Sequence, residues 1–187
     1  MAAVRAALTE DDLRMLVKGP TADDRALAAH KLCRAVDRDN LSRKELAQMR
    51  ARLEKEQGPR NPLKAGLGGY YDIDFALMYL RLKGAGIFYK VLNTPARIDI
   101  IEAMGHLERA DAEFMRDAAT FYRSMDHGLR VYSGHAEGSL PNSESQLEVL
   151  TELVHRWTPE HLNRQSLKIE LSKIQNRTRE IFDRLFS

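Results

Sequence analysis

Two aspartates separated by a single residue, Asp72 and Asp74, follow a glycine-rich run. That run starts beside Lys64 and contains Gly68 and Gly69. Acids at this spacing can hold metal ions for phosphate chemistry when they lie on a strand, because alternate strand residues point the same way. The residues that follow are apolar in a helical pattern, and positions two apart on a helix diverge by about 200°. We therefore expect no metal at this pair and no catalytic residue in the chain.

Other side chains that could do chemistry lack the partners that such chemistry needs. Glu152 and His155 have the spacing of di-iron ligands, but a site of that kind requires two such pairs, and the sequence has one. His127, beside Asp126, is interpreted as a packing or hydrogen-bonding residue. Cys33 has apolar neighbours at helical spacing, which favours a core residue over a nucleophile. The sequence contains no Walker loop, paired-cysteine motif or Gly-x-Ser-x-Gly elbow.

The formal net charge of +2 is too small to indicate nucleic-acid binding by itself. The local excess lies between Arg43 and Lys64, where seven Lys or Arg residues occur with three Glu residues. Basic and acidic side chains mixed at helical spacing are typical of a solvated helix face, and we favour that interpretation. RNA binding through this range is the weaker interpretation.

Length and composition fit one domain, or one domain with a small appendage. The 187 residues, 43% of them hydrophobic, are enough to bury a core without disulfides or metal. A single cysteine excludes an internal disulfide and favours a cytoplasmic protein. No stretch reaches the roughly 18 apolar residues of a membrane span. The apolar run at residues 1–8 is too short for a signal peptide.

Apolar periodicity and breaker residues predict an all-α bundle of about eight helices and no sheet. The expected helices lie at 10–17, 22–36, 42–57, 70–83, 94–104, 111–132, 143–157 and 159–185. Residues 1–45 are expected to form a small N-terminal helical segment, and residues 46–187 the main bundle. The helix at 70–83 is apolar nearly all round, so we expect it at the centre.

Several of these helices begin with recognisable cap residues. Ser42 and Ser143 each open a capping box, and Thr94 and Thr158 are each expected to cap a helix whose first residue is proline. The run at 87–92 has strand propensity but no partner run, so it is interpreted as an extended connector or a helical extension.

The string at 64–75, which reads Lys-x-Gly-x-Gly-Gly-x-x-Asp-Ile-acid-Phe, resembles the signature of a known family. It is similar to the helical domain of the glutamine synthetase adenylyltransferase/deadenylylases, which is related to that of the PII-uridylyltransferases. The resemblance continues through Arg123 and the acid-His-x-Leu-basic run at 126–130, and covers residues 49–186. The sequence departs from the family pattern at Asp74, where Glu is usual, and in the aromatic pair at 70–71.

The resemblance implies a division of labour between two domains. In the family, a separate nucleotidyltransferase domain uses ATP and magnesium to transfer AMP to a tyrosine of glutamine synthetase, or removes it by phosphorolysis. The helical domain would pack on that domain with Lys64, Gly68, Gly69, Asp72 and Asp74 facing its cleft. Packing or hydrogen-bonding roles are expected for Arg123, His127 and Arg130.

Residues 1–40 do not resemble the nucleotidyltransferase domain, so we expect this chain alone to hold no cofactor and to be inactive. Its expected partners are a nucleotidyltransferase domain or glutamine synthetase, with no membrane and no nucleic acid. The alternative is a stand-alone, non-enzymatic interaction module, in which residues 9–45 would be an added binding element.

Overall fold

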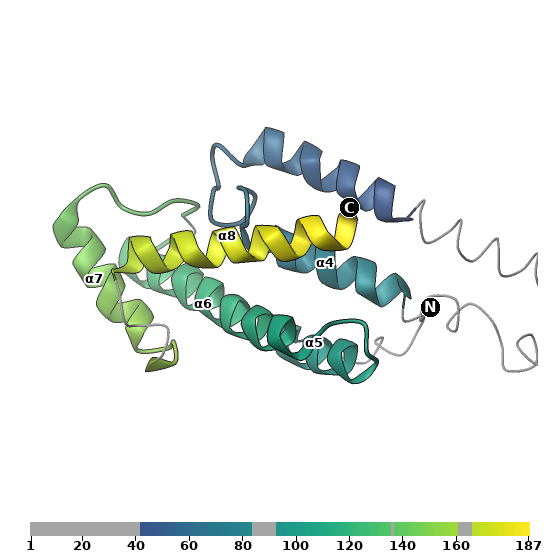
Figure 1. Cartoon of the computed structure of the whole chain (residues 1–187). Helices are drawn as coiled ribbons and strands as arrows, with labels where there is room; N and C mark the ends of the chain where they lie inside the picture. The colour runs from purple at the N-terminus through teal and green to yellow at the C-terminus, as the bar shows by residue number, and fades with distance from the viewer. Residues whose placement is uncertain (1–41, 84–92, 136, 161–165) are drawn as a thin grey trace, which may run out of the picture.

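The computed structural model describes residues 42–83, 93–135, 137–160 and 166–187, in which there are six helices and no strand (Figure 1). The helices lie at residues 42–57 and at α4 (Tyr70–Lys83), α5 (Thr94–Ala103), α6 (Arg109–Ser133), α7 (Glu144–His155) and α8 (Leu167–Phe186). The all-α prediction is thus confirmed for these residues. The helices expected at 10–17 and 22–36, the run at 87–92 and Cys33 lie outside them.

The central position expected for α4 is confirmed. It contacts α5, α6 and α8, and its side chains at Ile73, Ala76 and Leu80 are at most 1% exposed. A helix covered on three sides must be apolar around most of its circumference, which is why its sequence shows no clear polar face. Met78, which is 45% exposed, and Arg81 are the described residues of α4 with exposed side chains.

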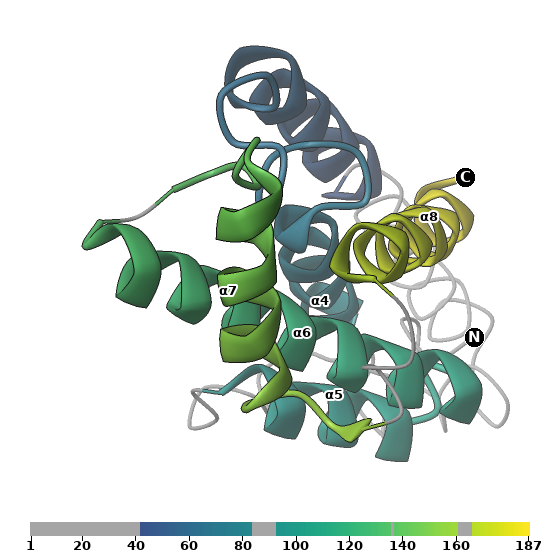
Figure 2. The same ribbon diagram turned by 90° about the vertical axis from the view of Figure 1, so that its left-hand side faces the viewer.

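The remaining helices pack around α4 in two groups. The long helix α6 packs against both α5 and α7, and buries Met115, Phe121, Met125 and Leu129. Gly128 of α6 lets α7 approach closely, because a Cβ there would lie 3.0 Å from Leu150 Cδ1. The helix at 42–57 lies on the opposite side of α4 and α8 from α5, as both views show (Figures 1 and 2).

Polar contacts hold the helix at 42–57 onto α8. Arg43 donates to the carbonyl of Ser187 at 2.5 Å, and Arg179 pairs with Glu54 at 3.0 Å. The expected solvated basic face is only partly present, because Arg50 is buried while Arg52 and its exposed neighbours face solvent. The helix runs through position 45, and the proposed division between residues 45 and 46 stays a prediction.

Two of the expected caps were assigned to the wrong residue or helix. The N-cap of α5 is Asn93, whose side chain accepts from the Ala96 N–H at 2.8 Å, while Thr94 is already helical and buried. Thr158 donates its hydroxyl to the carbonyl of Val154 at 2.8 Å, so it closes α7. The last helix, α8, begins at Leu167, with Ser166 at the N-cap position.

The capping box expected at the start of α7 is absent. Ser143 does occupy the N-cap position, but its hydroxyl lies 3.0 Å from the Ser145 hydroxyl and makes no capping hydrogen bond. The spacing of residues in the sequence does not predict whether a serine hydroxyl bonds a neighbouring side chain or the backbone N–H that it could cap.

Within the residues that the structure describes, none of the helices combines the length and apolarity needed to cross a membrane.

Candidate functional site

The glycine-rich segment at 64–69, called the glycine turn below, is a compact loop that leads directly into α4. Its ends are tied by backbone hydrogen bonds from Tyr70 N–H to the Leu63 carbonyl at 3.0 Å and from Tyr71 N–H to the Lys64 carbonyl at 2.9 Å. Gly68 has a φ of +67° and lies so close to α8 that a Cβ would be 1.9 Å from the Gln175 carbonyl oxygen. Only glycine satisfies both conditions.

The Asp72 carboxylate lies beneath this turn and is 0% exposed. It accepts from Arg50 Nε at 2.5 Å and from the Gly68 N–H at 3.0 Å, and Arg179 Nη1 lies 3.6 Å away. One carboxylate therefore joins the helix at 42–57, the glycine turn and α8. Burial raises the pKa of Asp72 above its usual range, while Arg50 and Arg179 act in the opposite direction.

Asp74 faces different neighbours from Asp72. Its half-buried carboxylate lies in the field of Arg97 from α5 and Arg123 from α6. Burial raises its pKa above the usual range, against the effect of these two arginines. The separation of the two acids follows from the helical spacing.

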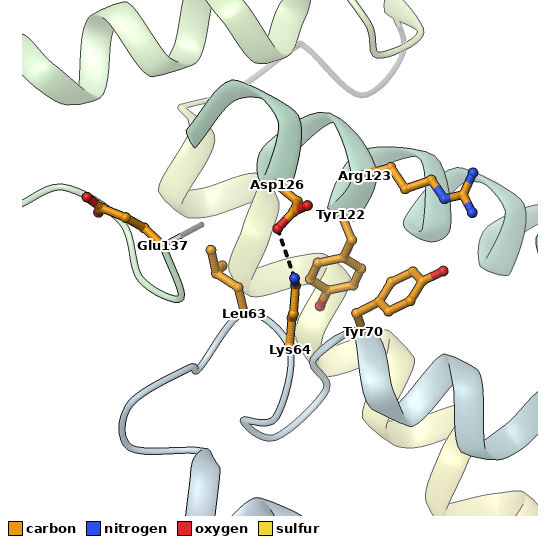
Figure 3. A pocket seen from close by; sticks show the side chains of 7 residues that line it. All are labelled: Leu63, Lys64, Tyr70, Tyr122, Arg123, Asp126 and Glu137. Carbon is orange, nitrogen blue, oxygen red and sulfur yellow. Dashed lines mark ion pairs between the residues drawn. The ribbon is translucent and has the colours of Figure 1, made fainter. Parts of the chain in front are cut away.

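A pocket of about 200 Å³, called the turn pocket below, opens between the glycine turn and α6 (Figure 3). Lys64 reaches across it to Asp126 at 2.9 Å, and Arg130 pairs with the same carboxylate at 2.9 Å. Although partial burial acts to raise the pKa of Asp126, Lys64 and Arg130 together lower it below the usual range.

The floor of the turn pocket is tied to the glycine turn. Tyr122 of α6 donates its hydroxyl to the Gly68 carbonyl at 2.5 Å, and its ring packs edge-on against Tyr70. Burial raises the pKa of Tyr122, with the Asp72 charge adding to the effect, so this hydroxyl stays protonated and remains a donor.

A larger hollow of about 530 Å³, called the α4–α6 groove below, lies along α4 and is also lined by the helix at 42–57, through Leu53 and Gln57, and by residues of α5 and α6. Tyr70 and Arg123 line both this groove and the turn pocket, so the two hollows adjoin. Its lining includes Tyr70, Asp74, Met78, Arg81, Arg97 and Arg123.

The structure brings some of the sequence-predicted site residues together and separates others. Lys64 and Arg130 meet at Asp126. Gly68 and Gly69 are buried against α8 and the loop backbone, and of the two aspartates only Asp74 keeps exposed surface. That these residues face a neighbouring domain's cleft stays a prediction.

The other predicted residues lie on α6. His127 packs its ring edge-on against Trp157 at a centroid distance of 4.4 Å, near the end of α7. Arg123 is exposed at the junction of the two hollows.

Arg50 and Arg179 were missed by the sequence reasoning. Arg50 sits among exposed charged residues, and nothing in its spacing distinguishes it from them. Its pairing with Asp72 arises from the approach of two helices, which a local pattern does not encode.

Among the described residues, no group of three or more His, Cys, Asp and Glu side chains could hold a metal ion. The charged groups around the two hollows are instead arginines, a lysine and three acids, with one acid in the groove and two in the pocket. This donor set suits electrostatic contact with anions better than metal coordination.

The described residues thus define an all-helical domain in which a glycine turn is held by a buried arginine–aspartate pair. The chain belongs to the GlnD PII-uridylyltransferase family, whose sequence model matches residues 30–186. This confirms the resemblance drawn from the string at 64–75.

Several relatives carry the same name, bifunctional glutamine synthetase adenylyltransferase/adenylyl-removing enzyme. The one from Rhodopseudomonas palustris strain TIE-1 is 31% identical over 145 residues, which is 75% of this chain and 14% of the relative. Those from Thioalkalivibrio sulfidiphilus and Streptomyces coelicolor are 31% and 28% identical, over 67% and 73% of this chain and 13% and 15% of their own lengths. The chain thus spans about a seventh of the length of such relatives. No solved structure matches it significantly.

The raised pKa of Asp74 predicts a specific pH dependence for the variant Asp74→Asn. Because the pKa of Asp74 is raised in the folded state, its contribution to the free energy of unfolding is fully present below the unfolded pKa of 3.8. That contribution is lost as pH rises through the folded pKa. Asparagine cannot ionise, so we expect Asp74→Asn to gain stability relative to the wild type between pH 4 and pH 7. Urea unfolding at both pH values measures this, with Glu148→Gln on the exposed face of α7 as the control. A relative loss with rising pH would contradict it.

Proposed function

We propose that this chain is the helical accessory domain of an adenylyltransferase-like regulator of glutamine synthetase in the cytoplasm. The observation that carries the proposal is the family match over residues 30–186, together with relatives named for adenylyl transfer and removal. In this proposal a separate nucleotidyltransferase domain supplies the catalytic acids and holds ATP and magnesium.

The role of the helical domain in this proposal is to position a surface against the catalytic domain. The buried Arg50–Asp72 pair ties the glycine turn to the helix at 42–57, since Arg50 also donates to the Gly66 carbonyl and losing one partner of a buried pair is costly. The turn in turn places Lys64 and the start of α4 beside Arg123. Charged groups at the edge of an interface with the catalytic domain would orient that domain more than they would add affinity.

Two assays test the proposal. The purified 187-residue chain is incubated with labelled ATP, magnesium and glutamine synthetase, and we expect no transfer of AMP. The same chain is then titrated against a purified nucleotidyltransferase domain from a relative, and against glutamine synthetase alone, by isothermal calorimetry. We expect saturable binding to the nucleotidyltransferase domain.

Each assay can refute a different part of the proposal. AMP transfer that disappears in Asp74→Asn, a variant chosen because Asp74 retains exposed surface, would show that the chain is itself catalytic. An absence of binding both to the nucleotidyltransferase domain and to glutamine synthetase would favour the alternative, a stand-alone interaction module without these partners.

A further inference from the structure

A strip of apolar and aromatic side chains lies on the surface where α6 and α7 pack side by side (Figure 2). On α7 and the turn that follows it, Val149, Leu153 and Trp157 are spaced by four residues, so they form one stripe. On α6, His127 and Val131 have the same spacing. Val131, Val149 and Trp157 are 55%, 49% and 40% exposed. These five residues are called the α6–α7 seam below.

Contacts between the two helices place both halves of the seam on one surface. The His127 ring packs against Trp157 at a centroid distance of 4.4 Å, and the Ser124 hydroxyl donates to the Trp157 carbonyl at 3.2 Å. Further along α6, a Cβ at Gly128 would lie 3.0 Å from Leu150 Cδ1. The helices are therefore antiparallel, and the α6 half of the seam lies beside the α7 half.

Charged residues border the seam on both sides. They are Asp126 and Arg130 on α6, and Glu148, Glu152 and Arg156 on and just after α7. Each of them directly precedes a seam residue in the sequence, so it lies about 100° from that residue around its helix. The residues that directly follow the seam residues are buried or half-buried between the helices, so the charged residues lie on the outer edges.

The charges on the two edges follow opposite orders. From the Trp157 end of the seam, the α6 edge has Asp126 and then Arg130, whereas the antiparallel α7 edge has Arg156 and then Glu152. Asp126 and Arg130 pair with each other at 2.9 Å and keep 30% and 51% of their side-chain surface exposed. A second copy turned by 180° about an axis along the seam would therefore set each α6 edge against an α7 edge of opposite charge.

From this self-complementarity we propose that two copies of this chain associate through the α6–α7 seam as a two-fold dimer. The two seams pack together, Arg130 of each copy faces Glu152 of the other, and Asp126 faces Arg156. Two-fold dimers are the commonest homo-oligomers, and their interfaces join the same patch of both subunits. Because the seam is narrow, the dimer is weak, with a dissociation constant of roughly tens of micromolar. The proposed accessory role is not needed for this inference.

The first experiment is sedimentation equilibrium of the full 187-residue chain over an about hundredfold range of concentration. We expect a reversible equilibrium between monomer and dimer. Val131→Glu should raise the dissociation constant at least about tenfold, because it places two carboxylates in the apolar centre of the interface. The matched control is Ile169→Glu, at a 51% exposed apolar residue of α8 outside the seam, which should change nothing. Both exchanged residues are exposed, so circular dichroism should show an unchanged fold.

A charge exchange tests the pairing across the dimer. Arg130→Glu and, separately, Glu152→Arg should each raise the dissociation constant about tenfold, because each sets like charges against each other twice per dimer. When the two variants are mixed in equal amounts, we expect a mixed dimer about as stable as that of the wild type. In that dimer every exchanged side chain again faces an opposite charge, an effect that contacts within one chain cannot produce.

Three results would overturn the proposal. They are a chain that stays monomeric at every concentration, equal weakening by Val131→Glu and Ile169→Glu, and mixed charge variants that associate no better than either variant alone. If the chain is monomeric but Val131→Glu abolishes its binding to a nucleotidyltransferase domain, the seam belongs to that domain and self-association is likewise refuted.

Discussion

Gly68→Ala is expected to lower the free energy of unfolding by about 3 kcal/mol or more. Alanine disfavours the left-handed backbone conformation at this position, and its Cβ would overlap α8. The added Cβ would lie 1.9 Å from the Gln175 carbonyl oxygen, and the next atoms it meets also belong to the backbone of α8. A side chain could rotate away, but a helix backbone can yield only by moving α8. That movement would also strain the contacts of Asp72 with the Gly68 N–H and Arg179.

Two other glycines provide matched controls for this prediction. Gly105 and Gly134 have φ values of +71° and +77°, close to that of Gly68, but a Cβ at either would meet nothing within 4 Å. Their alanine variants should therefore lose only the conformational part, about 1–2 kcal/mol. Urea unfolding followed by circular dichroism measures all three variants. Equal losses would show that the contact with α8 contributes nothing.

Asp72→Ala is expected to lower the free energy of unfolding by about 3 kcal/mol, because it removes the nearer counter-charge of the buried Arg50 guanidinium. Only Glu54 then remains, 3.4 Å from Arg50 Nη1 and 27% exposed. Arg50 is 1% exposed, and its second strong contact, from Nη2 to the Gly66 carbonyl at 2.7 Å, cannot compensate a full charge. The Gly68 N–H would lose its acceptor at the same time. We therefore expect a lower urea midpoint and looser packing of the glycine turn.

The control for this prediction shares one of the same arginines. Asp183 pairs with Arg179 at 2.9 Å but is 58% exposed, so Asp183→Ala should cost less than about 1 kcal/mol. A double variant, Arg50→Ala with Asp72→Ala, should lose less stability than the sum of the two single variants, because neither charge is then left alone. Strict additivity would mean that the two side chains do not interact as the structure shows.

Most of the helical framework could be predicted from the sequence because its determinants are local. The bounds predicted for the helix at 70–83 agree with α4, and those predicted at 111–132 differ from α6 by two residues at the start and one at the end. Apolar periodicity and glycine or proline breakers act over a few residues, so they can be read directly. The errors at Thr94, Ser143 and Thr158 arose where the hydroxyl bonds another partner: Tyr70 for Thr94, Ser145 for Ser143 and the Val154 carbonyl for Thr158.

The sequence by itself determined the family, the position of the glycine turn and the helical character of the residues that follow it. Only the tertiary structure decided which charges pair, since Arg50 meets Asp72 across 22 positions and Arg123 joins Arg97 beside Asp74 from a different helix. The physical reason is range. A backbone pattern is set by neighbours along the chain, whereas an ion pair or a groove exists only after helices distant in sequence have packed together.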